Sequence, residues 1–322
     1  MLSELRDGSD TKPILAALGR WPVDRLAALG HELVASPRDW ALSSALDHVF
    51  RLLSRTPSGA AAAADVAVGL PATEIRDVAA LLARSQRTNA LQQLLRQLPP
   101  GEQATELGAC LLHEMIVRRK SVARVAATWE RRLVGHPLAD LPLHPLPGET
   151  RLGGPWPSKA EMITVPGAVP TVERQTTPPD VTAAVHTWLT ESNGKAEAAL
   201  FTLAEPLAAA DVGIRTIEAL ELDSVAGGGL ALRRAALDNV VTTLFLAAAN
   251  GGAYSRRLGN AYGRAATWRS ISALAGGWHV GCTWWTFDAA NDWFRRVAWD
   301  LGVICLRPDG HVMAILSATD SD

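Results

Sequence analysis

The sequence has few cysteines and lysines, and it has no long hydrophobic run. Its 3 cysteines are an odd number without CxxC spacing, which argues against a disulfide framework and suits a reducing compartment. The longest nearly apolar run, residues 240–249, has about half of the roughly 20 residues that a membrane-spanning helix needs. The N-terminal stretch also lacks the apolar segment of a signal peptide, so we expect a cytoplasmic protein without membrane contact.

Charge is nearly balanced along the chain. The 322 residues include 31 Lys and Arg against 33 Asp and Glu, a formal net charge of −2. Nucleic acids and anionic membranes are bound through clustered positive charge, so neither is expected as a partner. Only 4 of the basic residues are lysines, and this arginine-rich, alanine-rich composition is also what a GC-rich genome produces.

Residues 1–134 show a succession of short amphipathic helices. Apolar side chains recur three and four residues apart in the runs that begin at Trp40, Ile75 and Leu91. Pro and Gly separate the helices, but no fixed repeat length is visible. The sequence therefore predicts an all-α N-terminal domain, either a helical bundle or an irregular helical repeat.

The composition changes in residues 135–180, which contain ten of the 19 prolines. Such a density forbids a regular helix, so we expect a proline-rich connector with one or two short strands, such as residues 162–165. Residues 181–322 then mix helix and strand patterns, including a long apolar helix from Leu237 and a Pro-Asp-Gly turn at 308–310 that is typical of a hairpin. The predicted fold class is α+β, with a small antiparallel sheet covered by the long helix in the C-terminal domain.

Established catalytic motifs are missing. The chain has no GxxxxGK[ST], no GxGxxG after a strand and no HExxH, so P-loop, Rossmann and zincin chemistry are unsupported. His279 and Cys282 could offer an imidazole and a thiolate, but a structural zinc site needs four ligands, so we expect no metal and no cofactor. A Cys282 nucleophile activated by His279 remains an alternative to a small buried thiol. Cys305, flanked by apolar residues, is expected in the core.

Residues 251–270 concentrate glycine, tyrosine and arginine. Backbone amides at a helix start near Gly259, together with Arg256, Arg257 and Arg264, would suit a phosphate or carboxylate. The same residues would also suit a close helix crossing, in which glycines allow tight approach and the arginines pair with Asp288, Asp292 or Asp300. The sequence leaves both interpretations open.

Tryptophan is also concentrated, with six of the 11 in residues 268–299. Trp284 and Trp285 are adjacent on a predicted strand and must point to opposite faces, so one can fill the core while the other covers a helix, a groove or a partner. The candidate ligand-binding residues of this region are Tyr254, Arg256, Arg257, Tyr262, Arg264, Trp268, Arg269, His279 and Cys282.

Three stretches carry a resemblance to known sequences: Gly-Gly-Ala-Tyr-Ser-Arg at 251–256, Tyr-Gly-Arg at 262–264 and Leu-Arg-Pro-Asp-Gly at 306–310. With these, residues 180–322 resemble an uncharacterised family of actinobacterial proteins that is classed as a domain of unknown function. The resemblance implies a genuine C-terminal module and no particular reaction.

We therefore expect a binding or interaction protein whose C-terminal Gly/Tyr/Arg/Trp-rich surface recognises a protein partner or an anionic ligand. The alternative is an enzyme that acts on a phosphate- or carboxylate-bearing substrate at the same surface. Its acid, base or nucleophile would come from four nearby groups, which are His279, Cys282, Tyr254 and Tyr262.

Overall fold

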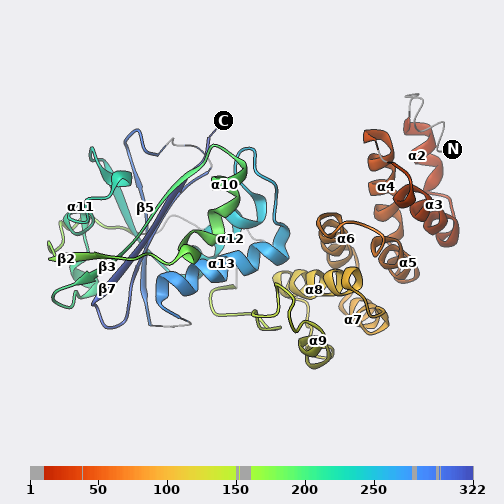
Figure 1. Ribbon diagram of the computed structural model, residues 1–322, viewed down its shortest axis with the longest axis horizontal. Helices are drawn as coiled ribbons and strands as arrows, with labels where there is room; N and C mark the ends of the chain where they lie inside the picture. Colours follow the sequence, from red (N-terminus) through yellow and green to blue (C-terminus); the bar gives the residue numbers. More distant parts are fainter. Residues whose placement is uncertain are drawn as a thin grey trace. The chain divides into compact units, whose positions relative to one another are not determined.

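A computed structural model describes residues 11–37, 39–149, 152, 161–277, 281–294, 297 and 299–321. The chain divides into two compact units, Met1–His144 and Pro145–Asp322 (Figure 1). The first is all-α and the second combines helices with an antiparallel sheet, so the predicted α+β fold class is confirmed. Within the described ranges, no helix has both the length and the apolar character that a membrane span requires.

The first unit consists of consecutive short helices, two of which are capped by a side chain at the first turn. The Asp39 side chain accepts the amide of Leu42 at the start of α4, and Thr56 accepts the amide of Gly59 at the start of α5. The helices are α2 (Thr11–Leu18), α3 (Val23–Ala35), α4 (Trp40–Leu53), α5 (Pro57–Ala67), α6 (Ala72–Ser85), α7 (Thr88–Gln97), α8 (Glu102–Val117) and α9 (Ala126–Arg132).

Polar contacts between these helices recur at sequence separations of 29 to 37 positions. His31 contacts Asp65, 34 positions on, and Trp129 donates to the carbonyl of Leu95, also 34 positions away. Gln86 donates to Ser54, at a separation of 32. Packing agrees with this spacing, because α3 contacts α5, α5 contacts α7, and α6 contacts α8. Stacked helix pairs of similar length favour the irregular helical repeat over the bundle.

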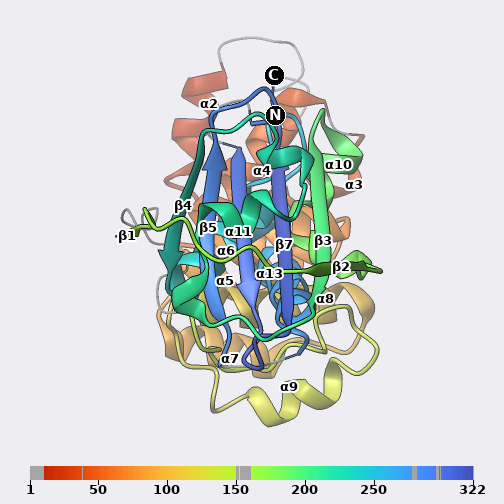
Figure 2. The same ribbon diagram turned by 90° about the vertical axis from the view of Figure 1, so that its left-hand side faces the viewer.

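The second unit is built on a seven-stranded antiparallel sheet with the order β1-β4-β5-β6-β7-β3-β2 (Figure 2). It is larger than the small sheet expected from the sequence. β6 and β7 form the predicted hairpin, whose turn ends at Gly310 with φ of 73°. The strands are β1 (Glu161–Met162), β2 (Val172–Gln175), β3 (Lys195–Leu203), β4 (Leu230–Ala235), β5 (Thr283–Ala289), β6 (Asp300–Leu306) and β7 (Val312–Thr319).

Both faces of the sheet are covered, as Figure 1 shows. One face carries the α-helices α12 (Leu237–Asn250) and α13 (Gly259–Ala275), which pack on each other. The other face carries α11 (Ile214–Glu218), where Ile217 joins Trp285 and Ile304 in a buried apolar cluster. The shorter helices of this unit are η2 (Pro179–Val185), α10 (His186–Glu191), η3 (Ala209–Asp211) and η4 (Asp223–Val225).

The proline-rich segment 135–180 is shared by the two units. Its first part ends the helical unit at His144, and its second part belongs to the sheet unit, where β2 pairs with β3. The short strand expected at residues 162–165 is instead Glu161–Met162. Prolines are compatible with this arrangement because β1 and β2 are the edge strands, where an amide need not be paired.

Candidate functional site

The candidate residues of the sequence analysis do not form one site. They are distributed along α13, which has 17 residues and is about 25 Å long. Tyr254, Arg256 and Arg257 lie in the loop before its first residue. Cys282 directly precedes Thr283 of β5, which pairs with Leu306 of β6. Arg307 follows Leu306 and donates to the carbonyls of Ala273 and Leu274 at the opposite end of α13. His279 lies outside the described residues.

Arg264 is buried inside the second unit. Its Nε lies 2.6 Å from Oε1 of Glu149 and its Nη2 lies 3.2 Å from Oε2, in a bidentate ion pair. The indole Nε1 of Trp268 also donates to Glu149 Oε1, at 2.6 Å, and the amide of Leu146 donates to Oε2. The Arg264 side chain is 0% exposed. This guanidinium therefore neutralises an internal carboxylate, which is that of Glu149 and not of Asp288, Asp292 or Asp300.

The other candidates on α13 differ in exposure. Tyr262 is half-buried and Arg269 is exposed. Cys282 is half-buried, whereas Cys305 is fully buried, which confirms the prediction that Cys305 belongs to the core.

The tryptophans of this region mainly fill space. Trp268, Trp284 and Trp285 are all buried, so neither side of the Trp284–Trp285 pair is open as a groove wall. Trp293 is half-buried, stacks edge-on against Phe294, and has the Lys195 ammonium over its ring. Trp278 lies outside the described residues.

The loop of residues 251–258, between α12 and α13, is fixed by side chains from distant parts of the chain. Asp320, at the end of β7, accepts the amide of Ala253 at 2.8 Å and the hydroxyl of Ser192 at 2.9 Å. The same Ser192 oxygen accepts the amide of Tyr254 at 3.3 Å. Asp320 is 1% exposed, so these hydrogen bonds are shielded from water.

The two ends of this loop are also held. Gly251, with φ of 75°, caps α12 by donating to Ala247, and the amide of Gly252 donates to Ser255 Oγ at 2.7 Å. Farther along, the Arg256 amide and its guanidinium both donate to the carboxylate of Glu191. The hydrogen bonds from Arg256 hold the pKa of Glu191 below its usual value. Successive backbone groups of the loop are thus fixed in one conformation.

This fixed loop presents three large side chains to solvent. Tyr254 is 64% exposed and the Arg256 side chain is 81% exposed. Arg257 is also exposed and makes no hydrogen bond or ion pair with any residue that the structure describes. An exposed tyrosine beside two arginines offers both apolar area and positive charge.

A groove in the helical unit lies between α4 and α6 and has a volume of about 280 Å³. Its floor is apolar and its rim carries three acidic side chains against one arginine. No sequence signal indicated it, because stacking of helix pairs brings its two halves together. It is lined by Leu46, Asp47, Phe50, Arg51, Leu70, Glu74, Asp77, Val78 and Leu81.

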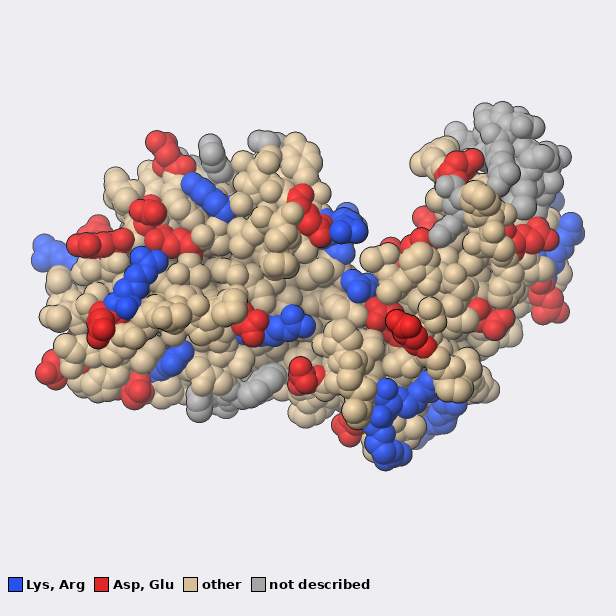
Figure 3. All heavy atoms as spheres, viewed as in Figure 1, with Lys and Arg blue, Asp and Glu red and all other residues tan. Residues whose placement is uncertain are grey.

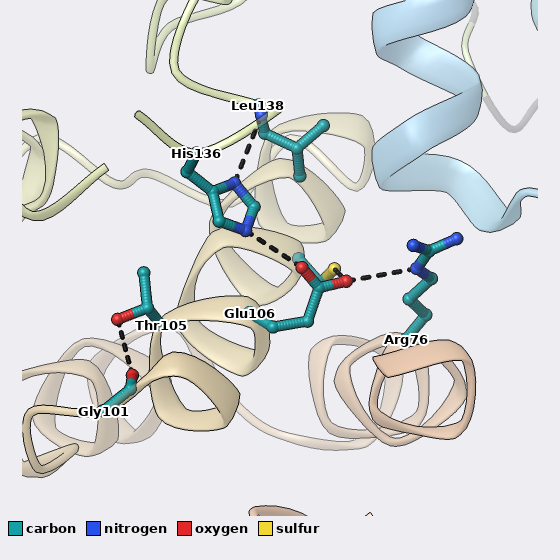
Figure 4. Close-up of polar contacts among 7 residues, drawn as sticks. Arg76, Gly101, Thr105, Glu106, His136 and Leu138 are labelled. Atoms are coloured by element: carbon teal, nitrogen blue, oxygen red, sulfur yellow. Dashed lines mark hydrogen bonds and ion pairs between the residues drawn. The ribbon is translucent and has the colours of Figure 1, made fainter. Parts of the chain in front are cut away.

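Glu106 on α8 is the centre of a buried polar cluster in the helical unit (Figure 4). Its carboxylate accepts Nε of Arg76 at 3.1 Å and Nε2 of His136 at 2.9 Å. His136 Nδ1 accepts the amide of Leu138, so the imidazole proton is on Nε2. Burial raises the pKa of the adjacent Cys110 thiol well above its usual value, so this thiol is unreactive. The cluster joins α6, α8 and the turn after α9.

Charge and ligand geometry add two further observations. On the face drawn in Figure 3, acidic and basic side chains are interspersed over the sheet unit, and Lys and Arg gather over α9, which carries Arg131 and Arg132. Within the described ranges, no three His, Cys, Asp or Glu side chains are arranged to hold a metal ion.

Comparison with known proteins gives one match. Neither the curated proteins nor the solved structures contain a match to this chain. A family model matches residues 15–322, which include almost all of both units. The chain therefore belongs to the Family of unknown function (DUF6183).

Proposed function

We propose that the protein is a binding protein that recognises a protein partner through the loop of residues 251–258. The observation that carries this proposal is that Tyr254 and Arg257 are exposed on a backbone already fixed by Asp320, Ser192 and Glu191. Tyr and Arg are the residue types that dominate binding energy at protein interfaces. A loop fixed before binding loses little conformational entropy in the complex.

The charges of the loop favour a protein surface over a small anion. Arg256 already shares its charge with Glu191, and Arg257 is exposed to water, where a single ion pair contributes little. An acidic surface that also covers the Tyr254 ring would gain apolar burial in addition to the charge interaction. We therefore propose a partner with an acidic patch around an apolar centre.

An enzymatic function has less support. Tyr254 and Cys282 lie near opposite ends of α13, about 25 Å apart by the length of that helix, so they cannot act on one substrate. Arg264, the best anion-binding candidate of the sequence, is paired with Glu149. A reaction needs an acid, base or nucleophile near the substrate, and the loop offers the phenol of Tyr254 and the hydroxyl of Ser255, which already accepts the Gly252 amide.

The acidic groove between α4 and α6 supports the same class of function. Its apolar floor and net negative rim would accept a partner segment with apolar and basic side chains. A cytoplasmic location and an actinobacterial source, both expected from the sequence, belong to this proposal. The three free cysteines suit a reducing compartment.

The proposal is tested by quantitative affinity capture with matched variants. Immobilised wild-type protein is compared with a Tyr254→Ala, Arg257→Ala double variant, and with Arg234→Ala, Arg269→Ala as a control. The control removes two exposed arginines of the same unit that lie outside the loop. We expect a partner that is retained by wild type and control but lost from the loop variant, with all three equally folded by circular dichroism. Equal retention by the loop variant would refute the proposal.

A further inference from the structure

The register of the sheet brings two cysteines together at the end of β5. In the antiparallel pair of β5 and β6, Trp284 lies opposite Cys305. Side chains alternate along a strand, so Cys282, two residues before Trp284, lies on the same face and diagonal to Cys305. The neighbouring Cys305 thiol lowers the pKa of Cys282. This proximity could not be predicted from the sequence, because 23 positions separate the two residues.

The two thiols have different surroundings. Cys282 is half-buried and reachable from solvent, whereas Cys305 is fully buried, and burial raises its pKa well above the usual value. The Arg307 guanidinium also lowers the pKa of Cys282, against the opposing effects of partial burial and of Asp309. Arg307 is held in place by donating to the carbonyls of Ala273 and Leu274. Cys282 is thus a half-buried thiol near a guanidinium, with a second thiol diagonally across the strand pair.

From this arrangement we infer that Cys282 is a peroxide-reactive thiol and that Cys305 is the resolving thiol that converts the oxidised product into a disulfide. An accessible, partly ionised thiol with a neighbouring resolving cysteine is the arrangement on which reversible thiol oxidation depends. The co-reactant is a hydroperoxide, either hydrogen peroxide or an organic hydroperoxide.

The chemistry proceeds in two balanced steps. The Cys282 thiolate attacks the terminal oxygen of the hydroperoxide, an S–O bond forms, the O–O bond breaks, and the alkoxide or hydroxide leaves and takes up a proton. The Cys305 sulfur then loses its proton and attacks the Cys282 sulfur, so that an S–S bond forms and hydroxide leaves as water. Together the two thiols lose two electrons, which reduce one peroxide molecule. An organic hydroperoxide gives one alcohol and one water, and hydrogen peroxide gives two waters.

The position of Cys282 allows the movement that disulfide formation requires. Diagonal positions across a strand pair are farther apart than most disulfides allow, so the backbone of one cysteine must shift. Cys282 follows Gly281 and precedes Thr283, the first residue of β5 that pairs with β6. A shift at residue 282 therefore breaks no pairing between these strands.

Cys110 provides an internal control. It is fully buried in the helical unit and contacts Glu106. Because burial and the neighbouring carboxylates both disfavour its thiolate, we expect Cys110 to react at least about tenfold more slowly than Cys282 with the same peroxide.

The test treats the reduced full-length protein with a small excess of hydrogen peroxide, blocks remaining thiols with N-ethylmaleimide, and maps cysteine peptides by mass spectrometry. We expect a peptide pair joined between Cys282 and Cys305, with Cys110 alkylated. In Cys305→Ala, which avoids a buried hydroxyl, Cys282 should accumulate sulfenic acid that dimedone traps. In Cys282→Ser, no disulfide should form.

Three results would overturn the inference. They are an unmodified Cys282 after peroxide treatment, a Cys282 that proceeds to sulfinic acid in wild type without a disulfide, and oxidation of Cys110 as fast as that of Cys282. Circular dichroism of each variant before treatment checks that the fold is retained. The result is independent of partner binding by the loop of residues 251–258.

Discussion

The Arg264 guanidinium and the Glu149 carboxylate form a bidentate pair inside the second unit, with both side chains almost completely inaccessible to solvent. The pair links α13 to a segment 115 positions earlier in the chain. It also receives the indole N–H of Trp268. The Glu149 carboxylate is thus satisfied by two buried donors, and the Arg264 guanidinium is engaged inside the fold.

Removing one member of this pair should be costly. In Arg264→Ala, the Glu149 carboxylate stays buried without its counter-ion, and we expect a loss of about 3–5 kcal/mol in the free energy of unfolding. Arg269→Ala is the matched control, because Arg269 is on the same helix and exposed, and we expect a change within about 0.5 kcal/mol. Urea unfolding followed by circular dichroism measures both. Similar small losses for the two variants would contradict the pairing.

Asp320 should control the opening of the loop of residues 251–258. Asp320→Ala removes the acceptor of the Ala253 amide and the Ser192 hydroxyl, and each such charged hydrogen bond contributes about 1.5–3 kcal/mol. Trypsin cleaves after Arg256 and Arg257 only when the loop opens, so we expect cleavage at least about tenfold faster than in wild type.

The control for this experiment is Asp292→Ala, because Asp292 is exposed and makes no hydrogen bond or ion pair within the described part of the chain. Its cleavage should match wild type. If Asp320→Ala is cut there no faster than Asp292→Ala, Asp320 does not fix the loop.

The ion pair at Glu191 should give a defined pH dependence. Because Arg256 lowers the pKa of Glu191 in the folded state below the usual 4.5, the pair stabilises the fold above that value and the contribution is lost as the pH falls through the lower, folded-state pKa. The stability difference between wild type and Glu191→Gln should therefore be largest near neutral pH and disappear in acid. Glu218→Gln, at an exposed position, should show no such trend. A difference that grows on acidification would contradict the assignment.

Substitution by serine should destabilise the fold differently at Cys282 and at Cys305. Cys305→Ser places a hydroxyl in a fully buried apolar setting, at an expected cost of about 1–3 kcal/mol, whereas Cys282 is half-buried and its serine variant can reach solvent. Melting temperatures of the reduced variants should therefore fall more for Cys305→Ser. The opposite order would exchange the roles of the two residues.

Much of the fold could be predicted because its signals are local. The apolar stripe from Leu237 predicts α12, and Asn250-Gly251-Gly252 predicts its end. The Pro-Asp-Gly turn predicts the hairpin of β6 and β7. Each depends on residues close together in the chain, where spacing and turn chemistry determine the backbone.

The partners of the candidate residues could not be predicted. Nothing near Glu149, in a proline-rich segment, indicates that it pairs with Arg264, and nothing near Asp320 indicates that it holds Ala253. The stacking of the N-terminal helices could not be predicted either. Its regularity lies in the sequence separation of contacting residues and not in the residue types. Such contacts are determined by tertiary packing, which local periodicity does not predict.

Site-specific photo-crosslinking tests the proposed function most directly. A photoreactive phenylalanine analogue is placed at Tyr254 in one variant and at Val169 in another, since Val169 is 67% exposed in the same unit and lies outside the loop. Both are irradiated in cells that naturally contain the protein. If the loop of residues 251–258 binds a partner, position 254 should give a discrete crosslinked protein that position 169 does not. No crosslink from position 254, or the same products in equal yield from both positions, would contradict the proposal.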